Sequence, residues 1–190
     1  MNGAMAMTAG ILCMGSCTTN TQGEENAATK TNDNGGKAVV CYFSATGTTE
    51  RAAKRIARAI GADIFEITPE KKYTDADLDW RNSKSRSSIE MHDRSSRPAI
   101  SGKLEDADKY EVVFIGYPNW WNSAPTIINT FIESTPLEGK TIVPFMTSGG
   151  SDIVNSEKEL TRSYPNLKFE KGLLVNGVSD EDIEKWAKGF

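Results

Sequence analysis

Hydrophobic and polar residues alternate in a regular order from residue 37 onward. Short, almost continuous apolar runs, typical of strands buried on both faces, occur at 38–43, 64–67, 112–116, 141–146 and 168–175. Between and after them, apolar residues recur at helical spacing, at 52–60, 127–132, 156–163 and 183–190. Strands that alternate with helices form a parallel sheet covered on both faces. The pattern therefore predicts one α/β domain over residues 37–190.

The first 36 residues lack this alternation. Residues 4–16 are apolar or small and too few to span a bilayer, and residues 18–36 are polar. We interpret 1–17 as an export leader and 18–36 as a tether. Gly15 and Ser16 before Cys17 resemble a bacterial lipoprotein cleavage site, where the cysteine becomes the lipidated first residue. This predicts export and lipid anchoring at the cell envelope; the alternative is a disordered leader on a cytoplasmic protein.

Charge and composition exclude several classes of partner. The chain has 22 Lys+Arg and 26 Asp+Glu, a net charge of -4, which argues against nucleic-acid binding and against a basic membrane-binding face. One His and three Cys show no zinc-ligand spacing, so we expect no metal site. Chemistry is then expected from an organic cofactor, carboxylates or hydroxyls.

The turn after the first predicted strand carries hydroxyl groups. Ser44, Thr46, Thr48 and Thr49 supply them, and Gly47 lets the backbone turn its amides over the start of the next helix. The turn has neither the Lys of a nucleotide-triphosphate loop nor the glycines of a dinucleotide fold. It suits one terminal phosphate monoester held by neutral donors. The alternative is a capped helix with a threonine-rich start.

Two later loops are expected at the same edge of the sheet. Residues 118–125 place Trp120 and Trp121 in a surface connection, where large apolar groups favour a flat ligand that covers them. Residues 147–151 have a permissive backbone that can approach the polar edge of a heterocycle. Together the loops indicate an aromatic ring system with a phosphate tail. We expect one of the two tryptophans to pack in the core, under the third helix.

With these loops the chain resembles the flavodoxins, in particular a bacterial subfamily with FSATGTT, PNWW and TSGG loops and a DLDW…SRSS…SRP insertion. The resemblance covers residues 37–190. It implies a three-layer sandwich, a five-stranded parallel sheet of order 2-1-3-4-5, and FMN at the switch between the first and third strands. The resemblance also implies which residues hold the FMN phosphate: Ser44, Thr46, Gly47, Thr48 and Thr49, with the backbone of Ala45. It implies that the ring is lined on one side by Pro118, Asn119, Trp120 and Trp121, and on the other by Ser148, Gly149 and Gly150.

An insertion of 42 residues, 69–110, separates the second and third predicted strands. Its middle, 81–97, has five Lys or Arg against two acids. The segment either receives an anionic cosubstrate near the flavin or is a basic, solvated flap whose arginines pair with acids on the body. His92 is a candidate proton donor, with a surface or structural role as the alternative.

The resemblance implies single-electron transfer to a redox partner protein or a small-molecule acceptor. Residues 37–190 hold 21 Lys+Arg and 23 Asp+Glu, a net charge of −2, whereas flavodoxins that dock on partners tend to be strongly acidic. Two alternatives therefore stay open. One is an NAD(P)H-dependent FMN reductase acting on quinones or nitro compounds, and the other is an anchored, non-enzymatic module that has lost FMN.

Overall fold

The computed structural model describes residues 37–190. The predicted leader 1–17, with Cys17, and the tether 18–36 lie outside the described residues. Among the helices of residues 37–190, none is both long and apolar enough to cross a membrane.

A parallel sheet forms the centre of the domain. Its order is β2-β1-β5-β6, with β7 and β8 both pairing with β6 on its outer side. The strands are β1 (Ala38–Tyr42), β2 (Asp63–Glu66), β5 (Val112–Pro118), β6 (Thr141–Thr147), β7 (Lys168–Phe169) and β8 (Leu173–Leu174). Counted along the chain, with β7 and β8 in the fifth position, this is the predicted order 2-1-3-4-5. The sequence prediction of the sheet is therefore confirmed.

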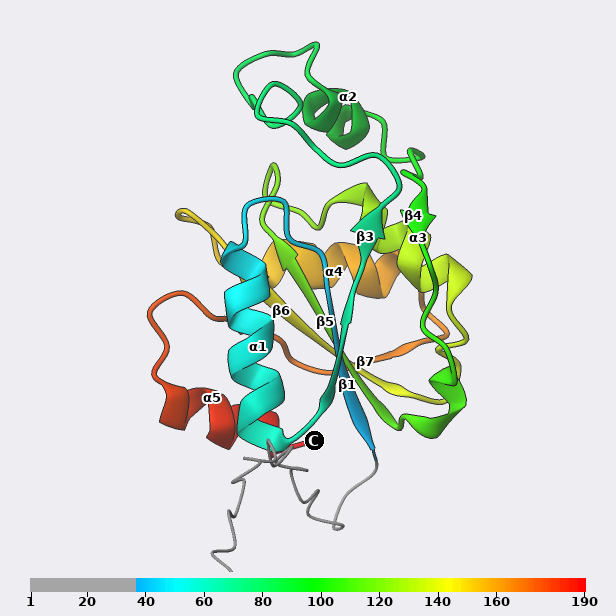
Figure 1. Ribbon diagram of the computed structural model, residues 1–190, viewed down its shortest axis with the longest axis vertical. Coiled ribbons are helices and arrows are strands. Elements are labelled where there is room, and N and C mark those ends of the chain that lie inside the picture. Colours follow the sequence, from blue (N-terminus) through cyan, green and yellow to red (C-terminus); the bar gives the residue numbers. More distant parts are fainter. Residues whose placement is uncertain (1–36) are drawn as a thin grey trace, which may run out of the picture. The chain divides into compact units, whose positions relative to one another are not determined.

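Helices cover both faces of the sheet (Figure 1). Alternate side chains of a strand point to opposite faces, so β1 contributes Val39 and Cys41 to one core and Val40 to the other. Two helices cover each face: α1 (Thr48–Ile60) and α5 (Asp180–Ala187) cover one, and α3 (Thr126–Ser134) and α4 (Val154–Ser163) cover the other. The domain is the predicted three-layer sandwich.

The fifth strand position differs from the single run predicted at 168–175. β7 pairs with β6 at Phe169 and Ile142, and β8 resumes the pairing at Leu173 and Phe145. Between these two pairs the outer strand has one residue more than β6, as in a β-bulge. Pro144 lies in β6 within the stretch and has no N–H for the ladder. The apolar run at 168–175 predicted the strand, but it could not show that pairing with β6 is interrupted between β7 and β8.

The insertion folds beyond the carboxyl ends of β1 and β5 (Figure 1). Its elements there are the antiparallel pair β3 (Thr68–Pro69) and β4 (Ile100–Ser101) and helix α2 (Arg86–His92). The chain then returns to the amino end of β5, which the 3-10 turn η1 (Ala107–Lys109) precedes. Arg97 donates two 2.8 Å hydrogen bonds to Glu133 of α3, and Arg94 lies 3.2 Å from Glu159 of α4. These arginines pair with acids on the body, as the second interpretation of the insertion expected.

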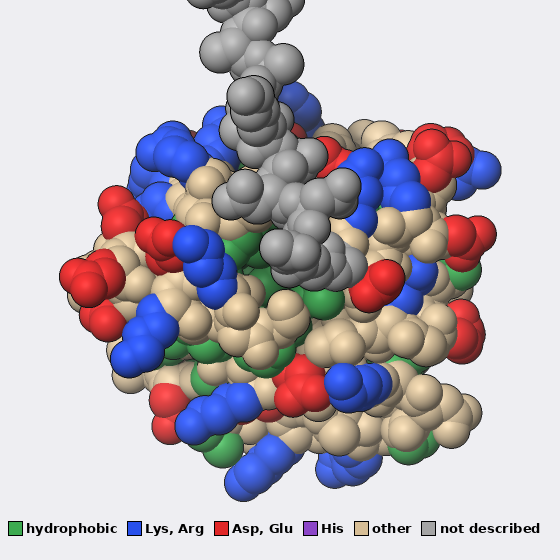
Figure 2. Space-filling view, turned by 90° about the horizontal axis from the view of Figure 1, so that it is seen from below, with side chains coloured by type: hydrophobic (Ala, Val, Ile, Leu, Met, Phe, Trp, Pro, Cys, Tyr) green, Lys and Arg blue, Asp and Glu red, His purple; other side chains and the backbone are tan. Residues whose placement is uncertain are grey.

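The face at the amino ends of the strands is charged but mixed. Figure 2 shows acidic and basic side chains interspersed over the part of this face that is visible. This agrees with the small net charge of the domain and gives no single-signed patch on the visible part.

Candidate functional site

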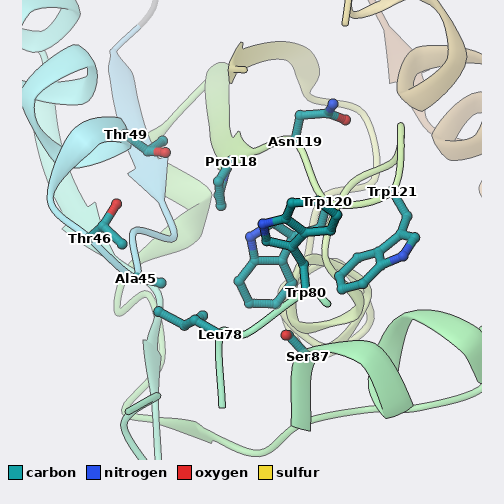
Figure 3. Close-up of a pocket in the computed structure, with 10 residues that line it drawn as sticks. All are labelled: Ala45, Thr46, Thr49, Leu78, Trp80, Ser87, Pro118, Asn119, Trp120 and Trp121. Atoms are coloured by element: carbon teal, nitrogen blue, oxygen red, sulfur yellow. The ribbon is translucent and has the colours of Figure 1, made fainter. Parts of the chain in front are cut away.

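A cavity of about 360 Å³ lies at the carboxyl ends of β1 and β5, on the side of the insertion. Three segments line it: the loop after β1, the loop after β5 and the insertion (Figure 3). The lining residues are Ala45, Thr46, Thr49, Leu78, Trp80, Ser87, Pro118, Asn119, Trp120 and Trp121. β1 and β5 are neighbours whose following helices cover opposite faces, so the cavity lies at the switch point where open α/β sheets bind ligands.

The loop after β1 joins the strand to the start of α1. Gly47 caps the helix with φ of 81°, a left-handed conformation that glycine adopts without steric cost. Thr49, the second residue of α1, lines the cavity, so the first amides of the helix lie next to it, and no side chain caps them. Ser44 Oγ is buried and has no hydrogen-bond partner among the described residues. Buried hydroxyls are normally paired. Of the predicted phosphate residues, Ala45, Thr46 and Thr49 line the cavity, whereas Ser44, Gly47 and Thr48 do not, and their contact with a phosphate stays a prediction.

A cation stands beside this loop, which the sequence analysis did not expect. Arg51, one helical turn after Gly47, donates a 3.3 Å hydrogen bond to Thr48 Oγ1. Its Nη1 lies 3.5 Å from the position that a Cβ on Gly47 would occupy. The expectation of neutral donors alone was therefore incomplete: an anion held at this loop would have a guanidinium within reach.

The loop after β5 presents two tryptophans with different roles. Trp120 is half-buried, and its ring packs edge-on against Phe43 at 5.6 Å and Tyr73 at 5.3 Å between centroids. Burial raises the pKa of Tyr73, and a hydrogen bond from its hydroxyl to Glu90 adds to the effect. Trp120 packs partly against the core, through Phe43 and Tyr73, but it also lines the cavity. The prediction of a tryptophan packed in the core is therefore met only in part, and its place under the third helix stays a prediction.

Trp121 instead stands at a strained turn. Trp120 and Ser123 exchange two 3.0 Å backbone hydrogen bonds, and between them Trp121 and Asn122 have φ of 48° and 59°. This is a turn of the primed type, which glycine and asparagine favour and a bulky residue does not. The Trp121 side chain is 42% exposed at the cavity. Strain that persists at a ligand-sized cavity favours a functional role for the indole.

Asn119 connects the tryptophan loop to the loop after β6. Its N–H donates to Thr147 O at 2.7 Å, and its Nδ2 donates to Ser148 Oγ at 3.3 Å, while its Oδ1 is buried with no partner among the described residues. Ser148 Oγ also accepts from the amides of Gly150 and Ser151. The TSGG loop thus contacts Asn119, whereas Ser148, Gly149 and Gly150 lie outside the cavity lining; their contact with a ring stays a prediction.

Three lining residues escaped the sequence analysis. Leu78, Trp80 and Ser87 come from the insertion and line the cavity with the two loops. Ser87 is the second residue of α2, whose N-cap is Ser85. The DLDW and SRSS motifs were the available signal, but spacing alone did not show which way the insertion folds.

His92, the candidate proton donor, lies at the end of α2 against Trp121. The two ring centroids are 6.2 Å apart. Its Nδ1 lies 2.6 Å from Ser88 O and must donate, because a carbonyl oxygen only accepts. Nε2 is then the nitrogen left for other partners. His92 is exposed and outside the cavity lining.

Comparison with known protein families matches residues 37–190 to flavodoxin. The chain belongs to the flavodoxin family. A comparison with curated proteins finds no match.

Among solved flavodoxin-like structures, two provisionally named flavoproteins are similar over nearly their whole lengths. The one from Bacteroides eggerthii is 54% identical, with 80% of this chain and 96% of that chain covered and a TM-score of 0.79. The one from Bacteroides uniformis is 55% identical, with 82% and 99% covered and a TM-score of 0.78. A Lactobacillus acidophilus flavoprotein, crystallised in complex with FMN, shares the fold at 20% identity, with 80% and 99% covered and a TM-score of 0.65.

Proposed function

We propose that the protein binds FMN in the 360 Å³ cavity and transfers electrons to or from a redox partner, either a protein or a small molecule. One observation carries the proposal: the hydroxyl-rich turn and the double-tryptophan loop line one and the same cavity. A ligand that fills it has an anionic group at one end and a flat aromatic body at the other. FMN has both.

The unpaired polar atoms fit this cofactor. The Thr46 hydroxyl, which lines the cavity, can donate to a phosphate oxygen, and Asn119 Oδ1 can accept from an N–H at the polar edge of the ring. Ser44, whose Oγ is unpaired but outside the lining, remains a proposed phosphate contact. Thr46, Gly47 and the first amides of α1 complete the phosphate end. Ser148, Gly149 and Gly150 remain proposed ring contacts, adjacent to Asn119.

FMN supplies the redox chemistry when it is bound. None of the ten residues that line the cavity has an ionisable side chain, so the walls bind and orient the ring and shield it from water without a side-chain acid or base. This favours electron transfer over reactions that need a proton from the wall. The Lactobacillus acidophilus flavoprotein, which shares the fold, was crystallised in complex with FMN, and this supports the choice of flavin.

A second candidate is an NAD(P)H-dependent reductase of quinones or nitro compounds. The observation that favours it is the place of His92, which lies against Trp121 with Nε2 unused by Ser88. In that role His92 would deliver a proton to the acceptor at the cavity rim.

The deciding experiment begins with the protein offered excess FMN and then freed of unbound flavin. A yellow protein with one FMN per chain is expected; a colourless protein overturns the proposal and leaves a module that has lost FMN. A redox titration follows, with NADH and NADPH then added to the oxidised form. Two separable one-electron steps and no oxidation of either nucleotide are expected for the carrier. Rapid two-electron reduction by a nucleotide identifies the reductase.

We further propose that the protein is exported and held at the membrane by a lipid on Cys17. The support is the sequence of residues 4–17 alone: an apolar segment with Gly15 and Ser16 before the cysteine. Palmitate labelling of the bacterial protein is expected and should be lost in Cys17→Ala. Labelling that Cys17→Ala leaves unchanged would contradict the anchor.

A further inference from the structure

The insertion supplies part of the wall of the proposed flavin cavity. Leu78 and Trp80 line it together with the loop after β1 (residues 44–49, the proposed phosphate loop) and the loop after β5 (residues 118–123, the tryptophan loop) (Figure 3). Figure 3 shows Ala45 and Thr46 on one side of the cavity and the tryptophans on the other. A ligand that joins the two loops therefore passes alongside the insertion.

Trp80 is unusually exposed for its size. Its exposed fraction is 68%, the highest among the large hydrophobic side chains of residues 37–190. An apolar side chain left in water forgoes the free energy of burial, in proportion to its exposed area. An exposed indole on the wall of a cavity recovers this free energy when a flat ligand covers it.

The wall that carries Trp80 is fixed in place. The Ser87 amide donates to Asp77 O at 2.9 Å, which ties α2 to the segment before Leu78. Asp77 in turn accepts from the amide and hydroxyl of Thr74 at 2.9 and 2.8 Å. These contacts hold the segment without using the Trp80 indole, whose ring lines the cavity and has the Arg81 guanidinium 5.6 Å from its centroid.

We propose that Trp80, supported by Leu78, is a binding residue for the isoalloxazine ring and forms the wall on the insertion side. The inference rests on the proposed function, because the occupant is the FMN ring. Its basis is the shared cavity: the phosphate loop fixes one end of the ligand, and the ring then reaches the tryptophans of both segments. The insertion is thereby a part of the cofactor site.

The test compares Trp80→Ala with Ile89→Ala in FMN and riboflavin titrations, followed by flavin fluorescence. Ile89 is a matched control, because it is 56% exposed on α2 and does not line the cavity. Trp80→Ala should weaken binding of both flavins by the same factor, roughly tenfold, as expected for loss of one aromatic stacking partner. Ile89→Ala should stay within about twofold of wild type, and Trp80→Phe should restore most of the loss.

A second readout is independent of affinity. Flavin bound to Trp80→Ala should be more accessible to iodide quenching than flavin bound to wild type, because one wall is missing. Wild-type protein that binds no FMN overturns the proposed function itself. Wild-type binding with unchanged affinity and unchanged quenching in Trp80→Ala overturns only this inference. Loss of FMN binding with normal riboflavin binding also overturns it, since Trp80 would then act on the phosphate end.

Discussion

The hydroxyl oxygens of Thr49 and Thr147 lie 2.8 Å apart in the interior. Thr49 is in the first turn of α1 and is 1% exposed; Thr147 ends β6 and is 7% exposed. Their hydrogen bond joins the start of α1, after the proposed phosphate loop, to the end of β6, where Thr147 O also accepts from the Asn119 N–H. Two segments of the proposed flavin site are therefore held in register without a ligand.

The first prediction concerns this pair. Thr147→Val leaves the Thr49 hydroxyl buried without its partner, so the free energy of unfolding should fall by about 1–2 kcal/mol. Thr49→Val should cost a similar amount, and the double variant should cost clearly less than the sum, because both polar groups are then removed. Urea unfolding of the four proteins measures the cycle. Strictly additive losses would show that the hydroxyls do not interact.

The sequence was sufficient for the sheet but not for the whole site. The strands β1, β5 and β6 are buried on both faces, so each is a nearly continuous apolar run in the sequence. The start of a helix after Gly47 could be predicted because glycine permits the turn and apolar residues then recur at helical spacing. The bulge between Phe169 and Leu173 depends on the neighbouring strand, which a linear pattern does not contain. Trp80 reaches the cavity only through the tertiary fold of the insertion, and the insertion has no periodic pattern of hydrophobic residues from which that fold could be predicted.

The second prediction concerns Arg51. Its guanidinium beside Thr48 adds attraction for a phosphate, so Arg51→Ala should weaken FMN binding about threefold to tenfold and leave riboflavin binding unchanged. The effect should shrink as salt is added, because the contact is exposed. Thr46→Ala and Gly47→Val should also weaken FMN binding. Unchanged FMN affinity in both would refute the phosphate loop.

Lys54→Ala is the control for Arg51. Lys54 lies on the same helix but pairs with Glu50 at 2.6 Å. It carries the same charge and should alter FMN binding less than Arg51→Ala. Equal effects of the two variants would mean that only the net charge of α1 matters.

The third prediction tests the strain at Trp121. Both Trp121→Ala and Trp121→Gly remove the indole, so both should weaken flavin binding alike. Glycine adopts φ of 48° without steric cost, whereas in alanine the Cβ makes this conformation unfavourable, so Trp121→Gly should be more stable than Trp121→Ala by about 1 kcal/mol. At Trp80, whose φ is not positive, the order should be the usual one, with alanine more stable than glycine. Thermal unfolding of the four variants gives the comparison, and the usual order at both positions would contradict the strain.

The fourth prediction concerns pH and the attachment of the insertion. The hydrogen bonds from Arg97 hold the pKa of Glu133 below its ordinary value, and the Tyr164 hydroxyl adds to the effect. A carboxylate with a lowered pKa stabilises the fold above its unfolded pKa of about 4.3, and this contribution is lost as pH falls through the folded pKa. The Glu133 side chain is 43% exposed, so solvent limits the contribution to about 0.5–1 kcal/mol.

Glu133→Gln should therefore lower the free energy of unfolding by that amount at about pH 7, and the difference from wild type should shrink below about pH 4. Glu105→Gln is a suitable control, because Glu105 is 74% exposed and lies 4.0 Å from Lys103. It should leave stability unchanged at both pH values. Because Arg97 and Glu133 join the insertion to α3, amide exchange in α2 should also quicken in Glu133→Gln. A stability difference that does not change with pH would mean that the pair contributes through packing alone.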